Sequence, residues 1–135
     1  MLFLTPSLKV TSIFEFPDIE NFKEEYSSTY RGYIAGLGII DGERYGIVVS
    51  HESHNHPSQV VPYEGAATGI GGILRDVLCM GSKILATADP LRFGNPAGKN
   101  KNHVKYVANE VINGIAGYSN AVGIPNIGGD IYFNE

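Results

Sequence analysis

The clearest pattern of apolar and polar positions lies in two short runs on either side of a turn. Residues 33–40 and 45–49 carry apolar side chains with several β-branched or aromatic members. Asp41-Gly42 lies between them, and this dipeptide favours the tight turn of a β-hairpin because both positions tolerate positive φ. The pattern therefore predicts an antiparallel hairpin.

Two later stretches show helical periodicity. Residues 73–80 have apolar positions that suit a helix, and Gly81 is a suitable C-terminal stop. Residues 103–118 carry an apolar stripe typical of a helix packed on a core. The stripe consists of Val104, Val107, Val111, Ile112 and Ile115.

The remaining stretches are less regular. Residues 84–88 resemble a buried strand, and residues 125–133 read as a glycine turn followed by a strand. The polar stretch 89–102, with its Pro and Gly, predicts a flexible loop. The glycine-rich stretch 65–72 predicts a second loop. Within the weakly patterned segment 5–30, residues 18–26 suit a short helix with Asp18 as its N-cap.

The resulting order is strand, strand, helix, strand, helix, strand. This order predicts an α+β fold in which a mixed or antiparallel sheet carries helices on one face. The length of 135 residues corresponds to a single domain, 1–135, and no linker marks a second one. Residues 1–30 form a weakly patterned N-terminal segment, and 33–133 form the main body.

The composition indicates which classes of protein this chain can belong to. Hydrophobic residues make up 43% of the chain and charged residues 18%, which favours an ordered globular protein over a disordered one. The net charge of −4 gives no basic face for nucleic acid. No apolar run reaches the roughly 20 residues of a membrane helix. The single cysteine, Cys79, cannot form an internal disulfide, so we expect a cytoplasmic protein with Cys79 as a core thiol.

The segment from His51 to Pro57 holds the densest group of reactive side chains. If it is extended, Glu52, His54 and His56 share one face, where they could bind a metal or move protons. The alternative is a polar loop with satisfied histidines. A zinc-protease helix is excluded because its second histidine would fall at position 55, which is Asn55.

Magnesium suits the available oxygen ligands better than zinc does. The candidate carboxylates are Glu52, Asp76, Asp89 and Asp130. Arg75, beside Asp76, offers a planar fork for phosphate, or else forms an exposed ion pair with it.

The predicted glycine loop is a candidate phosphate or nucleotide cradle, because backbone N–H groups before a helix can hold an anion. Tight packing is the equally weighted alternative. The residues concerned are Gly65, Thr68, Gly69, Gly71 and Gly72.

Several long motifs resemble one known family in the right order. They are ESHNHPS at 52–58, PYEGAATGIGG at 62–72, RD at 75–76, ADPLRFG at 88–94 and GIPNIGGDIYF at 123–133. Over about residues 33–133, the chain resembles the synthetase subunit of phosphoribosylformylglycinamidine synthase. That resemblance implies the N-terminal α+β domain shared with aminoimidazole ribonucleotide synthetase.

The resemblance implies an ATP- and Mg²⁺-dependent ligase of purine biosynthesis. ATP would activate an amide oxygen of formylglycinamide ribonucleotide, and ammonia would then displace phosphate to give the amidine. The implied partners are a glutaminase subunit, a small bridging subunit and a second copy in a homodimer. Neither nucleic acid nor membrane is expected as a partner.

The resemblance also implies residue roles. Glu52 and Asp76 would be magnesium ligands, and Arg75 would hold the substrate phosphate or a nearby anionic group. The segment Ser53, His54, Asn55 and His56 would contact substrate, with His54 as the proton acceptor.

The chain departs from the family pattern at several points. Many relatives carry a lysine where Ser50 stands, and often a glutamate where Asp130 stands. An upstream histidine and tyrosine found in relatives have no match in residues 1–30. Family chains are also much longer, so we expect a fragment or truncated relative. Two alternatives therefore stay open: a non-catalytic dimerising assembly module, or another ATP-using member of the same superfamily.

Overall fold

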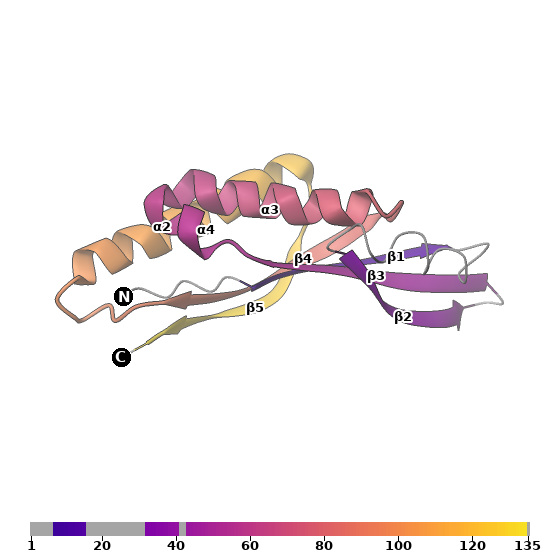
Figure 1. Ribbon diagram of the computed structural model, residues 1–135, viewed down its shortest axis with the longest axis horizontal. Coiled ribbons are helices and arrows are strands. Elements are labelled where there is room, and N and C mark those ends of the chain that lie inside the picture. The colour runs from indigo at the N-terminus through magenta and orange to yellow at the C-terminus, as the bar shows by residue number, and fades with distance from the viewer. Residues whose placement is uncertain (1–6, 16–31, 41–42, 135) are drawn as a thin grey trace.

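A computed structural model describes residues 7–15, 32–40 and 43–134. A five-stranded sheet carries the helices on one face, as Figure 1 shows. The elements, in chain order, are β1 (Ser7–Glu15), β2 (Gly32–Ile40), β3 (Glu43–Ser53), α2 (Asn55–Val60), α3 (Pro62–Leu78), β4 (Ile84–Phe93), α4 (Lys101–Val122) and β5 (Asn126–Phe133). The predicted α+β class with helices on one face of a mixed sheet is confirmed.

The strand order is β2-β3-β1-β4-β5. β2 and β3 pair antiparallel with Ile40 opposite Glu43, so the predicted hairpin is confirmed, although its turn lies outside the described residues. β1 is antiparallel to both β3 and β4, whereas β5 runs parallel to β4. The sequence did not predict β1, because its residues alternate too weakly. The predicted helix at 18–26 lies outside the described residues.

The predicted glycine loop at 65–72 is wrong, because the whole stretch lies inside α3. Pro62 occupies the first helical turn, where its missing N–H costs nothing, and Glu64 follows in that turn near the positive end of the helix dipole. Each glycine inside a helix costs about 0.5–1 kcal/mol in backbone entropy. Burial of Ile70, Ile73 and Val77 along one side of α3 offsets that cost.

The predicted strand at 84–88 is confirmed, but β4 continues to Phe93, so the loop predicted for 89–102 is too long. Pro90 had indicated a loop because proline donates no hydrogen bond. β4 pairs with β1 only as far as Ala88, and Pro90 lies beyond that pairing. Proline is therefore compatible with this part of the strand. The end of the predicted loop is also helical, since α4 begins at Lys101.

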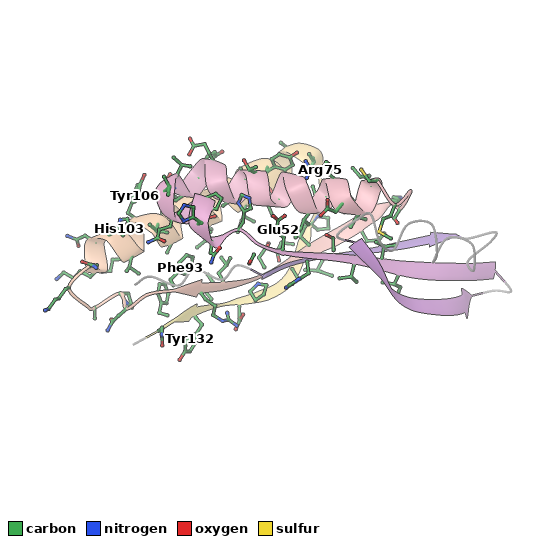
Figure 2. All side chains as sticks on the ribbon, viewed as in Figure 1. Glu52, Arg75, Phe93, His103, Tyr106 and Tyr132 are labelled. Carbon is green, nitrogen blue, oxygen red and sulfur yellow. The ribbon has the colours of Figure 1, made fainter. Side chains whose placement is uncertain are left out.

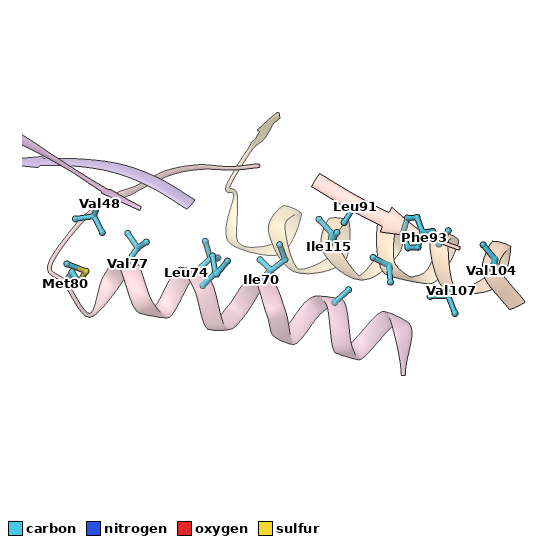
Figure 3. Packing of buried hydrophobic residues seen from close by; sticks show 14 residues of the cluster. Val48, Ile70, Leu74, Val77, Met80, Leu91, Phe93, Val104, Val107 and Ile115 are labelled. Atoms are coloured by element: carbon cyan, nitrogen blue, oxygen red, sulfur yellow. The ribbon is translucent and has the colours of Figure 1, made fainter. Parts of the chain in front are cut away.

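The core lies between the sheet and the two long helices (Figure 3). Its buried members are Val48, Ala66, Ile70, Ile73, Leu74, Val77, Met80, Leu91, Phe93, Val104, Val107, Ala108, Val111 and Ile115. The predicted stripe on α4 is confirmed except at Ile112, which is 41% exposed. Cys79 is also exposed, so its predicted place in the core is wrong: it caps the end of α3 beyond the last buried turn.

Candidate active site

The predicted site residues meet where the end of β3 lies beneath α3. Ser50 and Glu52 are two residues apart on β3, so they point to the same face of the sheet. Across from them, Gly69, Gly72 and Asp76 are spaced by three and four residues along α3, which places them in one stripe of the helix. The strand face and the helix stripe together form the candidate site.

His54 follows β3 directly and packs against the glycine end of this stripe. A Cβ placed on Gly69 would lie 3.0 Å from Cβ and 3.1 Å from Cγ of His54. The Nδ1 atom of His54 is buried and has no hydrogen-bond partner among the described residues. Gly69 therefore makes room for the imidazole, whose Nδ1 is enclosed at this contact.

Glu52 packs against the next glycine of the stripe. A Cβ placed on Gly72 would lie 3.2 Å from Oε2 of Glu52 and 3.9 Å from Nη2 of Arg75. Figure 2 shows Glu52 beneath α3 and Arg75 on that helix. The absence of a side chain at Gly72 thus lets a carboxylate and a guanidinium approach the same part of α3.

Asp76 completes the stripe near the end of α3. The buried hydroxyl of Ser50 donates a hydrogen bond to Oδ2 of Asp76 at 3.4 Å. Arg75 Nη2 lies 4.0 Å from Oδ1 of the same carboxylate, but the Arg75 side chain is 73% exposed. An exposed pair of that kind contributes little to stability, so Arg75 is available to bind an anion.

The prediction that Glu52, His54 and His56 share one extended face is wrong beyond Ser53. The strand ends there, because Asn55–Val60 forms the short helix α2. Glu52 and His54 do both face α3, whereas His56 lies exposed on α2. The side chain of Asn55 accepts a hydrogen bond from the backbone N–H of His56 at 3.0 Å. Ser53 and His56 are therefore reachable from solvent, beside a half-buried His54.

The proposed phosphate cradle loses its physical basis, because its residues are not in a loop. Backbone N–H groups within a helix bond to carbonyls four residues earlier and cannot surround an anion. The glycines serve packing instead. A Cβ on Gly65 would lie 2.5 Å from the backbone carbon of Pro57, and one on Gly71 would lie 2.9 Å from the ring of Tyr118. The tight-packing alternative therefore accounts for these residues, while Thr68 lies on the same helix.

The donor set suits a magnesium ion shared with a phosphate ligand. Magnesium is usually held by one or two carboxylates together with substrate phosphates and water. Glu52 and Asp76 supply two carboxylates from facing elements. In the described part of the chain, no three His, Cys, Asp or Glu side chains gather into a complete protein cage. The residues present thus fit a metal that arrives with its phosphate.

A second polar cluster lies on β4 and β5, away from these residues. Asp89 is only 6% exposed, and its Oδ2 accepts a hydrogen bond from the side-chain amide of Asn126. Burial raises the pKa of Asp89 to about 6, and the hydrogen bond from Asn126 only partly opposes that rise. In the sequence, this cluster was indicated only by the position of Asp89 at the end of an apolar strand. The burial of the Asp89 side chain could not be predicted from that pattern.

The raised pKa of Asp89 predicts a pH-dependent stability. Because the folded-state pKa of about 6 exceeds the ordinary value of 3.8, the protonated carboxyl stabilises the fold below pH 4. That contribution is lost as the pH rises through 6. The free energy of unfolding relative to Asp89→Asn should therefore fall by about 2–3 kcal/mol between pH 4 and pH 7. Urea unfolding of wild type and Asp89→Asn between pH 4 and pH 7 measures this difference. The prediction would be contradicted if the free energies of unfolding of the two proteins changed with pH in parallel.

Comparison with known proteins shows the family of this chain. The model of the family described as "AIR synthase related protein, N-terminal domain" matches residues 34–135. The chain belongs to this family. The match covers β2 through β5 and so includes every element of the candidate site. No solved structure matches the chain.

Two curated relatives place this AIR synthase-related domain among larger proteins. "Phosphoribosylformylglycinamidine synthase subunit PurL" of Methanothrix thermoacetophila is 59% identical over 101 residues, which are 75% of this chain and 13% of the relative. The protein of the same name from Leuconostoc mesenteroides is 48% identical over 119 residues, which are 87% of this chain and 16% of the relative. The resemblance seen in the sequence is therefore confirmed, and the chain spans about a seventh of these relatives.

Among the helices of the described residues, none combines the length and the apolar character that a membrane span requires.

Proposed function

We propose that this domain contributes to an ATP- and Mg²⁺-dependent ligase that makes formylglycinamidine ribonucleotide from formylglycinamide ribonucleotide and ammonia. One observation carries the proposal. Glu52 of β3 and His54 just after it pack against Gly72 and Gly69 of α3, and Ser50 of β3 bonds to Asp76 of the same helix. Similarity to the two synthase subunits supports the choice of reaction, which remains the property of the whole enzyme.

Within this proposal Glu52 and Asp76 hold the metal. A bound Mg²⁺ would supply charge neutralisation for the transferring phosphoryl group. Ser50 orients the Asp76 carboxylate through its hydroxyl, where many relatives carry lysine. Because the Ser50 side chain is buried, its contribution is to fix a ligand and not to reach the nucleotide.

His54 acts as the proton acceptor through Nε2. Its Nδ1 is buried against Gly69, which fixes the plane of the ring and leaves the other nitrogen to face substrate. Ser53, Asn55 and His56 would contact substrate around it. Arg75, exposed and on the same side of α3, would bind the substrate phosphate or a nearby anionic group.

The substrate role is tested by titrating formylglycinamide ribonucleotide into the chain, using calorimetry. We expect Arg75→Ala to weaken binding about tenfold or more, since a charge-assisted contact to phosphate is lost. Lys105→Ala, at an exposed cation on α4, is the matched control and should leave binding unchanged. Equal binding by both variants would remove Arg75 from the substrate site.

The same domain would form a homodimer and work in the cytoplasm beside glutaminase and bridging subunits. Four large apolar side chains on the edge strand β5 support an interaction role: Ile127, Ile131, Tyr132 and Phe133 are 38–73% exposed. An assembly module without turnover is therefore the second candidate. Light scattering tests the dimer, and a monomer that also binds no partner would count against both assemblies.

A further inference from the structure

A cavity of about 400 Å³ lies between α4 and the strands β4 and β5. Its walls include the apolar side chains of Ile112, Ile115 and Ile131. Its polar side is formed by Asp89, Ser119 and Asn126. The cavity is separate from the candidate active site, because none of the residues of β3, α2 and α3 that form that site lines it.

Two residues on the polar side of the cavity each have a buried polar atom without a hydrogen-bond partner in the described part of the chain. Oδ2 of Asp89 is bonded to Asn126, but Oδ1 is buried and has no hydrogen-bond partner among the described residues. The hydroxyl of Ser119, a residue only 4% exposed, is in the same state. Buried polar atoms are nearly always hydrogen-bonded, since leaving one unpaired is costly. Two such atoms in the lining of one cavity indicate a missing partner.

Gly129 of β5 pairs with Asp89 across the sheet. Gly129 lines the cavity, and its backbone φ of +123° is one that residues with a side chain rarely adopt. A Cβ at Gly129 would lie 2.3 Å from the backbone oxygen of Asp89, so only glycine fits there. The adjacent Gly128 also lacks a side chain. At these two positions β5 adds no side chain to the space beside Asp89, whose carboxylate the strand contacts through Asn126.

The charge of the lining specifies the partner. Among the lining residues there is no Lys, Arg or His, and the titratable groups are Asp89 on β4 and Asp130 on β5. Asp130 already forms two hydrogen bonds with Arg92, at 2.7 and 3.0 Å. α4 contributes apolar and neutral side chains only. The cavity thus presents one uncompensated carboxylate within apolar walls.

We propose that this cavity binds a small organic cation, an amine or amidine whose N–H groups bond to Asp89 and whose apolar body lies against Ile112, Ile115 and Ile131. Its volume is within the range of about 300–1,000 Å³ that is typical of small-molecule sites. An N–H donor would pair with Oδ1 of Asp89, and the cationic charge would compensate the buried carboxylate. This assignment is independent of the proposed ligase function, because the two sets of residues do not overlap.

Benzamidine is a suitable probe, and calorimetry of the 135-residue chain at pH 7.5 is the measurement. We expect benzamidine to bind and benzoate, of similar shape but opposite charge, not to bind. Asp89→Asn should weaken benzamidine binding about tenfold or more, since a charged hydrogen bond is lost. Glu64→Gln, at an exposed carboxylate on α3 outside the cavity, is the matched control and should bind as wild type does.

A second variant keeps the test independent of Asp89. Ile112 is 41% exposed, so Ile112→Trp should fold and fill the cavity, which would block benzamidine. Circular dichroism verifies the fold of each variant. The proposal is overturned if the wild-type chain binds no benzamidine at millimolar concentration, if benzoate binds equally well, or if Asp89→Asn and Ile112→Trp both retain full affinity.

Discussion

Gly65→Ala is expected to displace the α2 helix and to disable the candidate active site. A Cβ at this position would lie 2.5 Å from the backbone carbon of Pro57 and 2.6 Å from the backbone nitrogen of Ser58. Both atoms belong to the backbone of α2, so relief requires the whole short helix to move away from α3. His54 and His56, at the start of α2, would move with it.

We expect Gly65→Ala to lower the free energy of unfolding by about 1–3 kcal/mol, as overpacking usually does. It should also weaken magnesium-dependent nucleotide binding about tenfold or more. Urea unfolding and calorimetry measure the two effects.

Gly71→Ala on the same helix is the matched control for this change. Its new Cβ would meet the end of the Tyr118 side chain, which is 38% exposed and can rotate aside. Alanine also gains up to about 1 kcal/mol over glycine in helix propensity. Gly71→Ala should therefore be as stable as wild type and bind nucleotide normally. If Gly65→Ala behaved in the same way, the close packing of α2 on α3 would be contradicted.

Phe93→Ala is expected to cause the largest loss of stability. Phe93, at the end of β4, is 1% exposed and packs into the core beneath α4, while its ring lies 5.6 Å from that of Phe133 (Figure 3). Removing it leaves a cavity that the surrounding helices cannot fill, at a cost of about 3–5 kcal/mol. Tyr106→Ala, at an aromatic residue 56% exposed on α4, should change stability by less than about 0.5 kcal/mol. Similar losses for both would show that Phe93 is not a core residue.

Elements with one strong local signal were predictable from the sequence. The hairpin of β2 and β3 has a two-residue turn between apolar runs, and α4 has an apolar stripe at helical spacing. Both patterns depend only on residues close together in the sequence, so they can be recognised without knowledge of the tertiary structure. Ile112 shows the limit: it has the right spacing, but no element of the described fold packs over it.

Elements that depend on distant partners were not predictable. β1 is stabilised by pairing with β3 and β4, and its own residues alternate only weakly. The first half of α3, residues 65–72, was predicted as a loop because its glycines are poor helix formers, whereas the helix predicted from residue 73 is present. These glycines are explained by contacts with other elements. Gly65 leaves room for α2, Gly69 for His54 and Gly72 for Glu52. The start of α3 could have been found from Pro62 and Glu64, a proline and an acidic residue in the first turn.

The candidate site was predictable in its residue types but not in its geometry. The run from Glu52 to His56 could be recognised as a candidate site because it combines a carboxylate with two imidazoles. The resemblance of its motif to a known family then implied a role for each residue. The sequence could not show that the strand ends at Ser53, nor that Ser50 bonds to Asp76 from the opposite element. The buried environment of Asp89 also depends on Asn126, 37 residues away.

We expect β3 and α3 to assemble a magnesium and phosphate site within this chain. Calorimetric titration with ATP or ADP, with and without Mg²⁺, tests it most directly. Wild type and Asp76→Asn are compared with Glu64→Gln, an exposed carboxylate in the first turn of α3. We expect magnesium-dependent binding that Asp76→Asn loses and Glu64→Gln keeps. No binding by a folded wild-type chain, or equal binding by Asp76→Asn, would contradict it.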